Sequence, residues 1–502
     1  MAIKINSVSG DKVKKYNVIV DHSQKYILAP VVPGCNIDSI ELEFDIENGG
    51  SAQKVSHADK DNHVKYVVTS HDECEEWIVA LREWGNAITG EFGYFADAEA
   101  DVFDGKYYVY PTSDGFEGWG GYYFKAFSSP DLINWTDEGV ILDLKADVSW
   151  SDGNAWAPCI IKKNGKYYYY YSANTDKFER NVGKAVGVAV CDTPTGRFKE
   201  PLGHPIVYDT MVITDEDGNE KTMNYPGQVI DPAVFTDPET GKSYLYWGNG
   251  SMWVCELNDD MISLKGEPKC ITPPNFREGA HIFYRKGIYY FTWAEDDTRN
   301  KNYHVRWGYS DNPMGPIIGN EIMIEKDESH GIYATGHHTI INVPDTDKWY
   351  ILYHRFNFPA RFEGDESDYY GVHRELCLDK FTFDNNGRIV KTKPTLEGVT
   401  EGEEFNTLSK IVSHTDLDVV DEGDVIEGTV EVQSGECETE VDVIMELYDY
   451  QSNLVGTVTE RVNVGQFTTN TVTLTIEAPE RMRGHYLEFF TDDGDEVRKL
   501  TY

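Results

Sequence analysis

Ile160-Ile-Lys-Lys-Asn-Gly-Lys-Tyr-Tyr-Tyr-Tyr170 reads as an apolar strand, a tight turn at Asn-Gly and an aromatic-rich strand. The same strand–turn–strand pattern occurs five times in the sequence, in copies that begin at Asp101, Ile160, Val234, Ile282 and Ile340. Each copy carries a tyrosine at a matching place; the five are Tyr108, Tyr168, Tyr244, Tyr290 and Tyr350. Repeats at this spacing are typical of the four-stranded blades of a propeller. The sequence therefore predicts an all-β protein whose centre is a five-bladed β-propeller.

A second set of matching positions lies eleven to thirteen residues before these tyrosines, where the innermost strand of each blade is expected to begin. They hold Asp97, Ala157, Asp231, Glu278 and His337. Burying several carboxylates together is electrostatically costly, and packing alone would not maintain such a group. A turn-capping role is the structural alternative for each acid taken singly. Their recurrence at one blade position instead indicates a functional site at the mouth of a central channel.

Composition excludes several classes of partner. The 502 residues contain 45 Lys and Arg against 86 Asp and Glu, a formal charge of −41. Nucleic acids and anionic membranes bind through clusters of basic residues, so neither is an expected partner. The eight cysteines show no paired short spacing, which predicts neither a zinc site nor a disulfide scaffold.

The first twenty residues contain no apolar run of signal-peptide length, and no later run is long enough to predict a membrane span. We expect a soluble protein, cytoplasmic or secreted with a leader not present in this chain. Pattern changes along the sequence predict three domains: a small antiparallel β accessory domain over residues 1–88, the propeller over 89–398, and a β-sandwich accessory domain over 405–502 with strict polar and apolar alternation.

Short motifs precede the blades in order. They are Phe95-Ala-Asp-Ala98, Trp156-Ala-Pro158, Ile230-Asp-Pro-Ala233, Arg277-Glu-Gly-Ala280 and Gly336-His-His-Thr-Ile340, with Gly371-Val-His-Arg-Glu375 in the last blade. In this order they resemble the family 43 glycoside hydrolases over about residues 92–398. The chain departs from many members of that family at Ala98 and Cys159, which are not the acids of the motif.

The resemblance implies a role for each acid. Asp97 matches the general base, Glu278 the general acid, and Asp231 the residue that orients the acid and raises its pKa. Inverting hydrolysis needs one ionised carboxylate to activate water and one protonated carboxyl to protonate the leaving oxygen. A third carboxylate beside Glu278 would disfavour its ionisation.

The resemblance also places a histidine, His337, on the propeller axis beside a calcium ion or an ordered water. Because calcium prefers oxygen ligands, waters would have to complete the shell of a weak Ca²⁺ site. A core histidine bonded to water is the alternative. No organic cofactor is expected.

Four further residues are candidates for contact with a sugar. Arg374 matches a family arginine that reaches sugar hydroxyls; a salt bridge to an acid is its alternative. Trp156 stands beside the channel position of the second blade and is suited to stacking on a sugar face. Phe116 and Trp119, in one Gly-rich loop, form either a wall of the substrate site or part of the loop's own packing.

The resulting hypothesis is an inverting glycoside hydrolase that cleaves α-L-arabinofuranosyl linkages in arabinan or a related plant cell-wall polysaccharide. A β-xylosidase acting on xylo-oligosaccharides is the alternative within the class. A non-catalytic carbohydrate-binding propeller is the alternative outside it.

Overall fold

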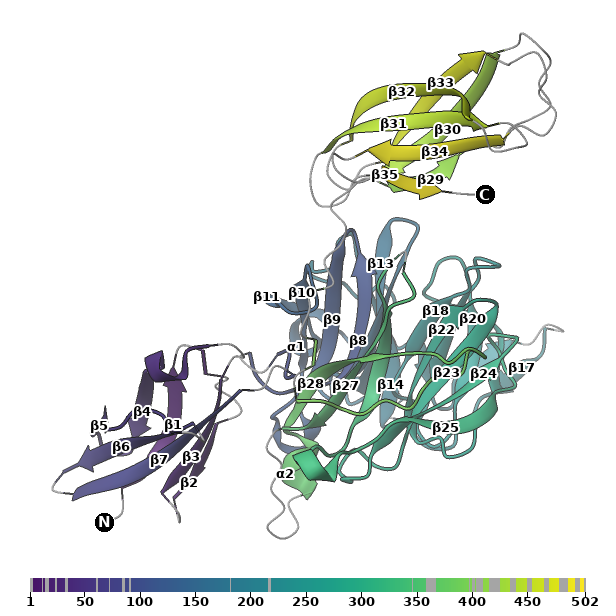
Figure 1. Ribbon diagram of the computed structural model, residues 1–502. Helices are drawn as coiled ribbons and strands as arrows, with labels where there is room; N and C mark the ends of the chain where they lie inside the picture. Colours follow the sequence, from purple (N-terminus) through teal and green to yellow (C-terminus); the bar gives the residue numbers. More distant parts are fainter. Residues whose placement is uncertain are drawn as a thin grey trace. The chain divides into compact units, whose positions relative to one another are not determined.

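Strands make up nearly all of the secondary structure. The computed structural model describes residues 3–10, 12–13, 18–22, 25–31, 35–59, 62–71, 73–83, 86–89, 92–180, 182–214, 218–344, 346–357, 367–396, 398–399, 402, 410–414, 425–433, 439–448, 454–464, 469–477, 486–492 and 497–500. Within these ranges the α-helices are α1 (Leu144–Asp147) and α2 (Ser367–Gly371). Neither has the length and apolar character needed to cross a membrane. The predicted all-β class is confirmed (Figure 1).

The chain divides into two compact units. One consists of Met1–Asp101 and Tyr107–Gly402, the other of Val102–Lys106 and Glu403–Tyr502. Within the described ranges no cysteine takes part in a disulfide bond, and Cys437 lies outside those ranges.

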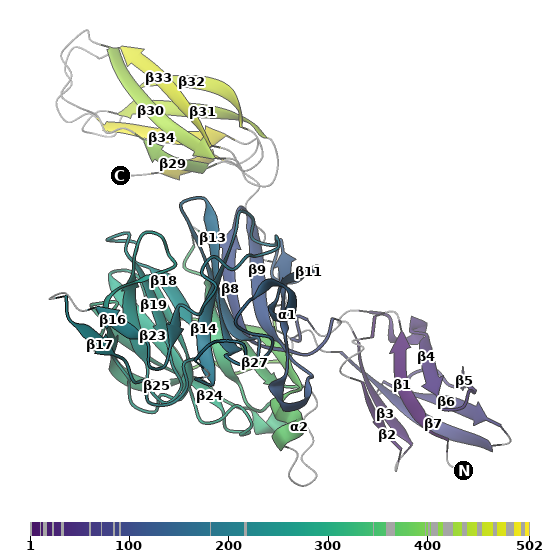
Figure 2. The same ribbon diagram turned by 180° about the vertical axis from the view of Figure 1, so that it is seen from behind.

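Five antiparallel sheets follow one another along the centre of the first unit (Figures 1 and 2). Sheet one contains β8 (Phe95–Phe103), β9 (Lys106–Ser113), β10 (Tyr123–Ser129) and β11 (Thr136–Asp143); sheet two contains β12 (Trp156–Lys163), β13 (Lys166–Asn174), β14 (Lys184–Cys191) and β15 (Val207–Tyr208). Sheet three contains β18 (Ala233–Thr236), β19 (Ser243–Trp247), β20 (Trp253–Leu257) and β21 (Leu264–Cys270). Sheet four contains β22 (Glu278–Arg285), β23 (Ile288–Glu295), β24 (His304–Ser310) and β25 (Ile318–Ile324), and sheet five contains β26 (Gly336–Asn342), β27 (Trp349–Phe356) and β28 (Arg374–Phe381).

The repeated strand–turn–strand pattern forms the first hairpin of every sheet. Its tyrosines all lie on the second strand and all are buried; they are Tyr108, Tyr168, Tyr244, Tyr290 and Tyr350. Apolar clusters join neighbouring sheets. One contains Tyr168 and Leu245 from sheets two and three, and another contains Tyr290 and Ile351 from sheets four and five. Such burial between sheets is what aromatic residues on successive strands provide.

A buried polar group joins the segment Asn86–Thr89 to sheet five. The backbone N–H of Ile88 donates to the carbonyl of Leu376, and the Asn86 side chain accepts from the N–H of Leu378 at 2.6 Å. The Asn86 amide also donates to Asp379 at 2.9 Å, while Arg355 donates to the Asn86 carbonyl at 2.9 Å. The outer edge of β28 is therefore covered by chain that precedes sheet one.

The described residues before Asn86 form two further sheets. A two-stranded sheet pairs β1 (Ile5–Gly10) with β4 (Leu42–Ile46). A five-stranded sheet has the order β2 (Ile19–Asp21), β3 (Tyr26–Val31), β7 (Glu73–Glu83), β6 (His63–Ser70) and β5 (Ser51–Lys54). The expectation of purely antiparallel pairing is wrong at one place. Strands β3 and β7 pair in parallel, which is possible because the long connection through β4, β5 and β6 provides a crossover.

The second unit contains the strongly alternating sequence. Its strands form a sheet of β29 (Lys410–His414), β30 (Val425–Gln433) and β33 (Thr469–Glu477), and a sheet of β32 (Leu454–Val464), β31 (Thr439–Tyr448), β34 (Tyr486–Asp492) and β35 (Val497–Leu500). Val430 of the first sheet and Val441, Met445 and Phe489 of the second belong to one buried cluster. Alternating residues thus supply a common core, as the sequence pattern indicates.

Candidate active site

The five sheets share one unusual backbone feature near the start of their first strands. Residues with left-handed φ occur at a matching place in each: Asp97 (45°), Ala157 (36°), Asp231 (55°), Gly279 (62°) and His337 (37°). For any residue other than glycine this region costs about 1–2 kcal/mol. The strand register shifts across this place in sheets two, four and five. Each sheet therefore bends its backbone at this matching position.

This geometry corrects one predicted equivalence. In sheet four the left-handed residue is Gly279, so Glu278 stands one position earlier than Asp97, Asp231 and His337 do in their sheets. A side chain at Gly279 would collide with the ring of His337, since a Cβ there would lie 3.1 Å from it. Glycine at this position lets the histidine ring approach sheet four closely.

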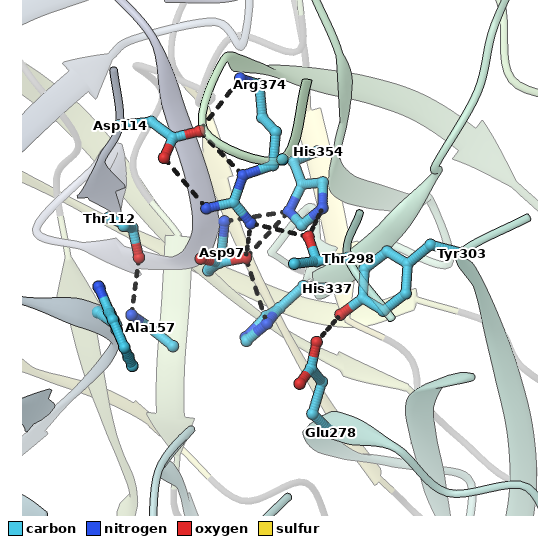
Figure 3. A network of polar contacts seen from close by, with 12 residues as sticks. Asp97, Thr112, Asp114, Ala157, Glu278, Thr298, Tyr303, His337, His354 and Arg374 are labelled. Atoms are coloured by element: carbon cyan, nitrogen blue, oxygen red, sulfur yellow. Dashed lines mark hydrogen bonds and ion pairs between the residues drawn. The ribbon is translucent and has the colours of Figure 1, made fainter. Parts of the chain in front are cut away.

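Side chains from the preceding sheet hold these bent segments. The N–H of Ala157 donates to Thr112 Oγ1 at 2.7 Å, and the N–H of Asp231 donates to Ser172 Oγ at 2.9 Å. The N–H of Asp97 donates to Nδ1 of His354 at 3.3 Å (Figure 3). Because His354 lies on β27, this last contact joins sheet five to sheet one.

Asp97 is surrounded by nitrogen atoms. Its Oδ1 lies 2.8 Å from Nη1 of Arg374, 3.1 Å from Nδ1 of His354 and 3.4 Å from Nδ1 of His337 (Figure 3). Burial raises the pKa of the Asp97 carboxyl, but the Arg374 charge and the two histidines outweigh burial and hold that pKa well below its ordinary value. Asp97 is therefore ionised at neutral pH.

Arg374 is buried and holds two acids at once. Its guanidinium donates to Asp114 from Nε at 2.9 Å and from Nη2 at 3.2 Å, and its Nη1 donates to Thr298 at 3.0 Å as well as to Asp97. Only 2% of the arginine side chain is exposed. The predicted contact between Arg374 and sugar hydroxyls stays a prediction, and the structure gives this residue a second task in fixing Asp97.

Glu278 has a different environment. Its two carboxyl oxygens accept hydrogen bonds from the hydroxyl of Tyr303 at 2.8 Å and from the side-chain amide of Asn249 at 2.5 Å. Burial raises the pKa of Glu278 to about 7, although Tyr303 and Arg277 act in the opposite direction. At neutral pH and below, this carboxyl can carry a proton.

Asp231 lies close to Glu278. One ligand atom of Asp231, one of Glu278 and one of His337 all lie within 4.8 Å of one another. Burial and then the charge of Glu278 raise the pKa of Asp231 well above its ordinary value. Because two carboxyl groups this close do not ionise together readily, the pair retains a proton.

His337 lies between the acids. Its Nδ1 is 3.4 Å from Asp97 and 3.9 Å from Asp231, and burial lowers its pKa to about 4. The imidazole is thus neutral at neutral pH. Together with Asp231 and Glu278 it offers one nitrogen and two carboxyl groups to a cation. These groups fit calcium weakly, since calcium prefers six or more oxygen ligands and both carboxyl groups favour a proton.

Two of the three predicted aromatic residues, Trp156 and Trp119, share one hydrogen-bond network. The indole N–H of Trp156 donates to the carbonyl of Trp119 at 2.8 Å, and Lys184 Nζ lies 4.9 Å from the Trp156 ring. The Trp119 indole N–H donates to the carbonyl of Gly371 at 3.0 Å. Phe116 instead packs edge-on against Tyr122 and Tyr123.

The cluster thus provides one ionised and one protonatable carboxyl group in a buried setting. Residues 93–389 match the family described as glycosyl hydrolases family 43. The chain belongs to that family. It is accordingly a glycoside hydrolase, and the alternative of a non-catalytic binding protein is not favoured.

Individual relatives of this family 43 chain have several activities. The β-D-galactofuranosidase xynD of Aspergillus niger is 33% identical over 322 residues, which cover 61% of this chain and 85% of that protein. An arabinoxylan arabinofuranohydrolase of Bacillus subtilis is 26% identical over 369 residues, covering 64% of this chain and 66% of that protein. The solved structure of a thermostable family-43 glycoside hydrolase is similar in fold, with a TM-score of 0.51 at 24% identity over 63% of this chain and 97% of that one.

Sequence reasoning missed four residues of this family 43 site. Asp114 binds Arg374, which contacts Asp97, and His354 contacts Asp97 directly. Asn249 and Tyr303 donate hydrogen bonds to Glu278. Asp114 and Asn249 each follow closely the second strand of a sheet, at the end where the first strand begins. The position just after the second strand of a repeat is therefore a sequence signal for site residues, as the position at the start of the first strand is.

Proposed function

We propose that this family 43 enzyme hydrolyses α-L-arabinofuranosyl linkages of arabinan or a related plant polysaccharide with inversion. Asp97 is the general base, Glu278 the general acid, and Asp231 the residue that maintains the proton on Glu278. The observation that carries the proposal is the opposite shift of two buried carboxyl pKa values, low at Asp97 and about 7 at Glu278.

The mechanism is a single displacement. Asp97 removes a proton from a water molecule as the water oxygen bonds to the anomeric carbon. The glycosidic bond breaks on the opposite face, and its oxygen takes the proton of Glu278. Asp97 ends protonated and Glu278 ionised, and proton exchange with solvent restores both groups.

Arg374 and His354 keep Asp97 ionised and oriented before the reaction. Tyr303 and Asn249 fix the carboxyl of Glu278 so that its proton points to one place. Preorganised polar groups of this kind avoid the reorganisation that water would need during the reaction. Asp231 acts through Glu278, because a proton leaving Glu278 would create a second charge beside it.

The substrate class follows from the relatives and from sugar stereochemistry. The Bacillus subtilis protein is an arabinoxylan arabinofuranohydrolase and the Aspergillus niger protein a β-D-galactofuranosidase. An α-L-arabinofuranosyl ring and a β-D-galactofuranosyl ring have the same configuration at every ring carbon and differ in the exocyclic arm. A β-D-galactofuranosyl substrate is therefore the second candidate. A β-xyloside, with a six-membered ring, is the third.

We further propose that the five central sheets form one five-bladed β-propeller over residues 89–398, flanked by accessory domains over 1–88 and 405–502. The contact between Asp97 and His354 supports closure of sheet five on sheet one. The accessory domains are proposed to support stability or polymer binding.

A weak calcium site is proposed beside His337, completed by water. It would offset repulsion among the acids, and no step of the reaction depends on it. Treatment with a chelator is expected to reduce kcat about twofold or less, while His337→Ala is expected to reduce it by about tenfold or more. Loss of all activity on chelation, restored only by a transition metal, would contradict this assignment.

The test of function is a panel of para-nitrophenyl glycosides with α-L-arabinofuranosyl, β-D-galactofuranosyl and β-D-xylopyranosyl groups. The expected order of kcat/KM places the two furanosides above the xyloside. Proton NMR of the first product formed is expected to show the inverted anomer. A preference for the xyloside, or retention of configuration, would overturn the proposal.

A further inference from the structure

Trp119 lies in the loop between β9 and β10 and is held by residues from three other sheets. Its backbone is left-handed, with φ 56°, at the end of the short helix η3 (Glu117–Trp119). For a tryptophan this conformation carries a cost that surrounding contacts must offset. The loop is therefore fixed in shape by its neighbours.

Sheet two holds the backbone of Trp119. The Trp119 carbonyl accepts hydrogen bonds from the Asn154 side chain at 3.1 Å and from the Trp156 indole at 2.8 Å. Lys184 fixes both donors, since its Nζ donates to Asn154 at 2.9 Å and lies over the Trp156 ring. Sheets one and two are thus bridged at this loop.

Sheets four and five hold the Trp119 ring. The indole N–H donates to the Gly371 carbonyl at 3.0 Å, and the Arg299 guanidinium lies 5.6 Å from the ring centre. Arg299 is itself anchored by Asp297 at 2.8 Å. A Cβ at Gly371 would lie 2.8 Å from Arg299 and 3.3 Å from Trp119, so these three residues meet without spare room.

This cluster lies at the end of the sheets that carries the acids. In an antiparallel sheet the start of the first strand and the loop after the second strand share one end. Thr298, next to Arg299, belongs to the site itself, because its hydroxyl oxygen accepts a hydrogen bond from Nη1 of Arg374, which also donates to Asp97. Asp114, in the same loop as Trp119, also binds Arg374.

We infer that the Trp119 clamp, defined as Trp119, Asn154, Trp156, Arg299 and Gly371, closes the substrate site on the side of sheets one and five. The enzyme then accepts the end of a sugar chain and releases monosaccharides. Internal cleavage requires chain on both sides of the broken bond, and the clamp would have to lose several hydrogen bonds to admit it. This inference rests on the proposed function.

The experiment uses reduced arabinopentaose and linear arabinan as substrates, with products followed by mass spectrometry. From both substrates the wild-type chain is expected to release arabinose as the only unreduced small product, and the reduced pentasaccharide is expected to shorten by one unit at a time. In Trp119→Ala oligosaccharides are expected among the early products from arabinan, at about ten times the wild-type background or more, the factor that loss of a steric penalty of about 1.4 kcal/mol gives. Arg299→Ala removes the contact between the guanidinium and the Trp119 ring, and it is expected to give a smaller rise in oligosaccharide release.

Tyr309→Ala is the matched control, because Tyr309 is an exposed aromatic residue at the opposite end of β24. It is expected to leave the product pattern unchanged. If Trp119→Ala fails to fold, Arg299→Ala decides the question. Oligosaccharides released by the wild type, or an unchanged pattern in the folded variants, would overturn the inference while leaving hydrolase function intact. Failure of the wild type on arabinan and on all three nitrophenyl glycosides would instead remove the proposed function.

Discussion

Asp97 and Asp231 occupy matching places in sheets one and three, with left-handed backbones and side chains about a tenth exposed or less. Their surroundings are opposite. Asp97 faces Arg374 and two histidines, which hold its pKa low, whereas Asp231 faces another carboxyl group, which raises its pKa. Similar burial thus goes with pKa shifts in opposite directions. The difference shows that the repeated backbone position determines where each carboxyl group lies, whereas side chains from the neighbouring sheet determine the direction in which its pKa shifts.

The largest expected effect is the loss of turnover when Asp97 is replaced. Asp97→Asn keeps the shape but cannot accept a proton from water, so kcat is expected to fall by about 10³-fold or more on every substrate. The measurement is kcat on arabinan and on nitrophenyl arabinofuranoside, with circular dichroism as the check on folding. Near-normal turnover in the folded variant would remove the assignment of the base.

Glu278→Gln is expected to show a loss that depends on the leaving group. Turnover of arabino-oligosaccharides should fall by about 10²–10⁴-fold, because their leaving oxygen needs a proton. Turnover of a nitrophenyl glycoside, whose leaving group is stable as an anion, should fall far less. An equal loss on both substrates would contradict an acid role for Glu278. Substitution of Glu278 would then have the same kind of effect as substitution of Asp97.

The pH profile of the wild type is expected to have one limb within the neutral range. Glu278 loses its proton as pH rises through about 7, so kcat/KM on oligosaccharides should fall about tenfold per pH unit above that value. Asp97 stays ionised on the acidic side because its pKa is well below the ordinary range. In Arg374→Gln that support is lost, and an acidic limb should appear. Absence of a new limb in the folded variant would show that Arg374 does not set the charge of Asp97.

The smallest expected effect is on stability. The pKa of Glu278 rises from 4.5 to about 7 on folding, so the stability that its neutral form provides is complete below about pH 4.5 and is lost as pH rises through 7. Glu278→Gln removes this dependence. The variant is expected to melt above the wild type at pH 8 by a few °C, the shift that about 1–2 kcal/mol gives, and near it at pH 4. Equal melting temperatures at both pH values would argue against a raised pKa.

Much of this arrangement could be predicted because a repeat is visible in sequence. The five tyrosines located the second strands, and counting back from them found Asp97, Asp231 and His337. The count misplaced Glu278 by one residue, since the left-handed position of sheet four is occupied by glycine, which carries no side chain to mark it. The partners Arg374–Asp114 and Glu278–Asn249 could not be paired from sequence, because each pair joins residues of different sheets.

The cover that Asn86–Thr89 provides for β28 also sets an order in time. This segment is synthesised before any of the five sheets, but the strand it covers, β28, is the last strand of those five sheets to be synthesised. During synthesis the segment therefore stays unpaired until β28 has been made. The buried hydrogen-bonded group of Asn86, Asp379 and Arg355 can form only when the last of the five sheets is complete. A chain shortened to the residues from 93 onward would leave the edge of β28 open for pairing with another molecule. Expression of the catalytic unit alone should accordingly begin before Asn86.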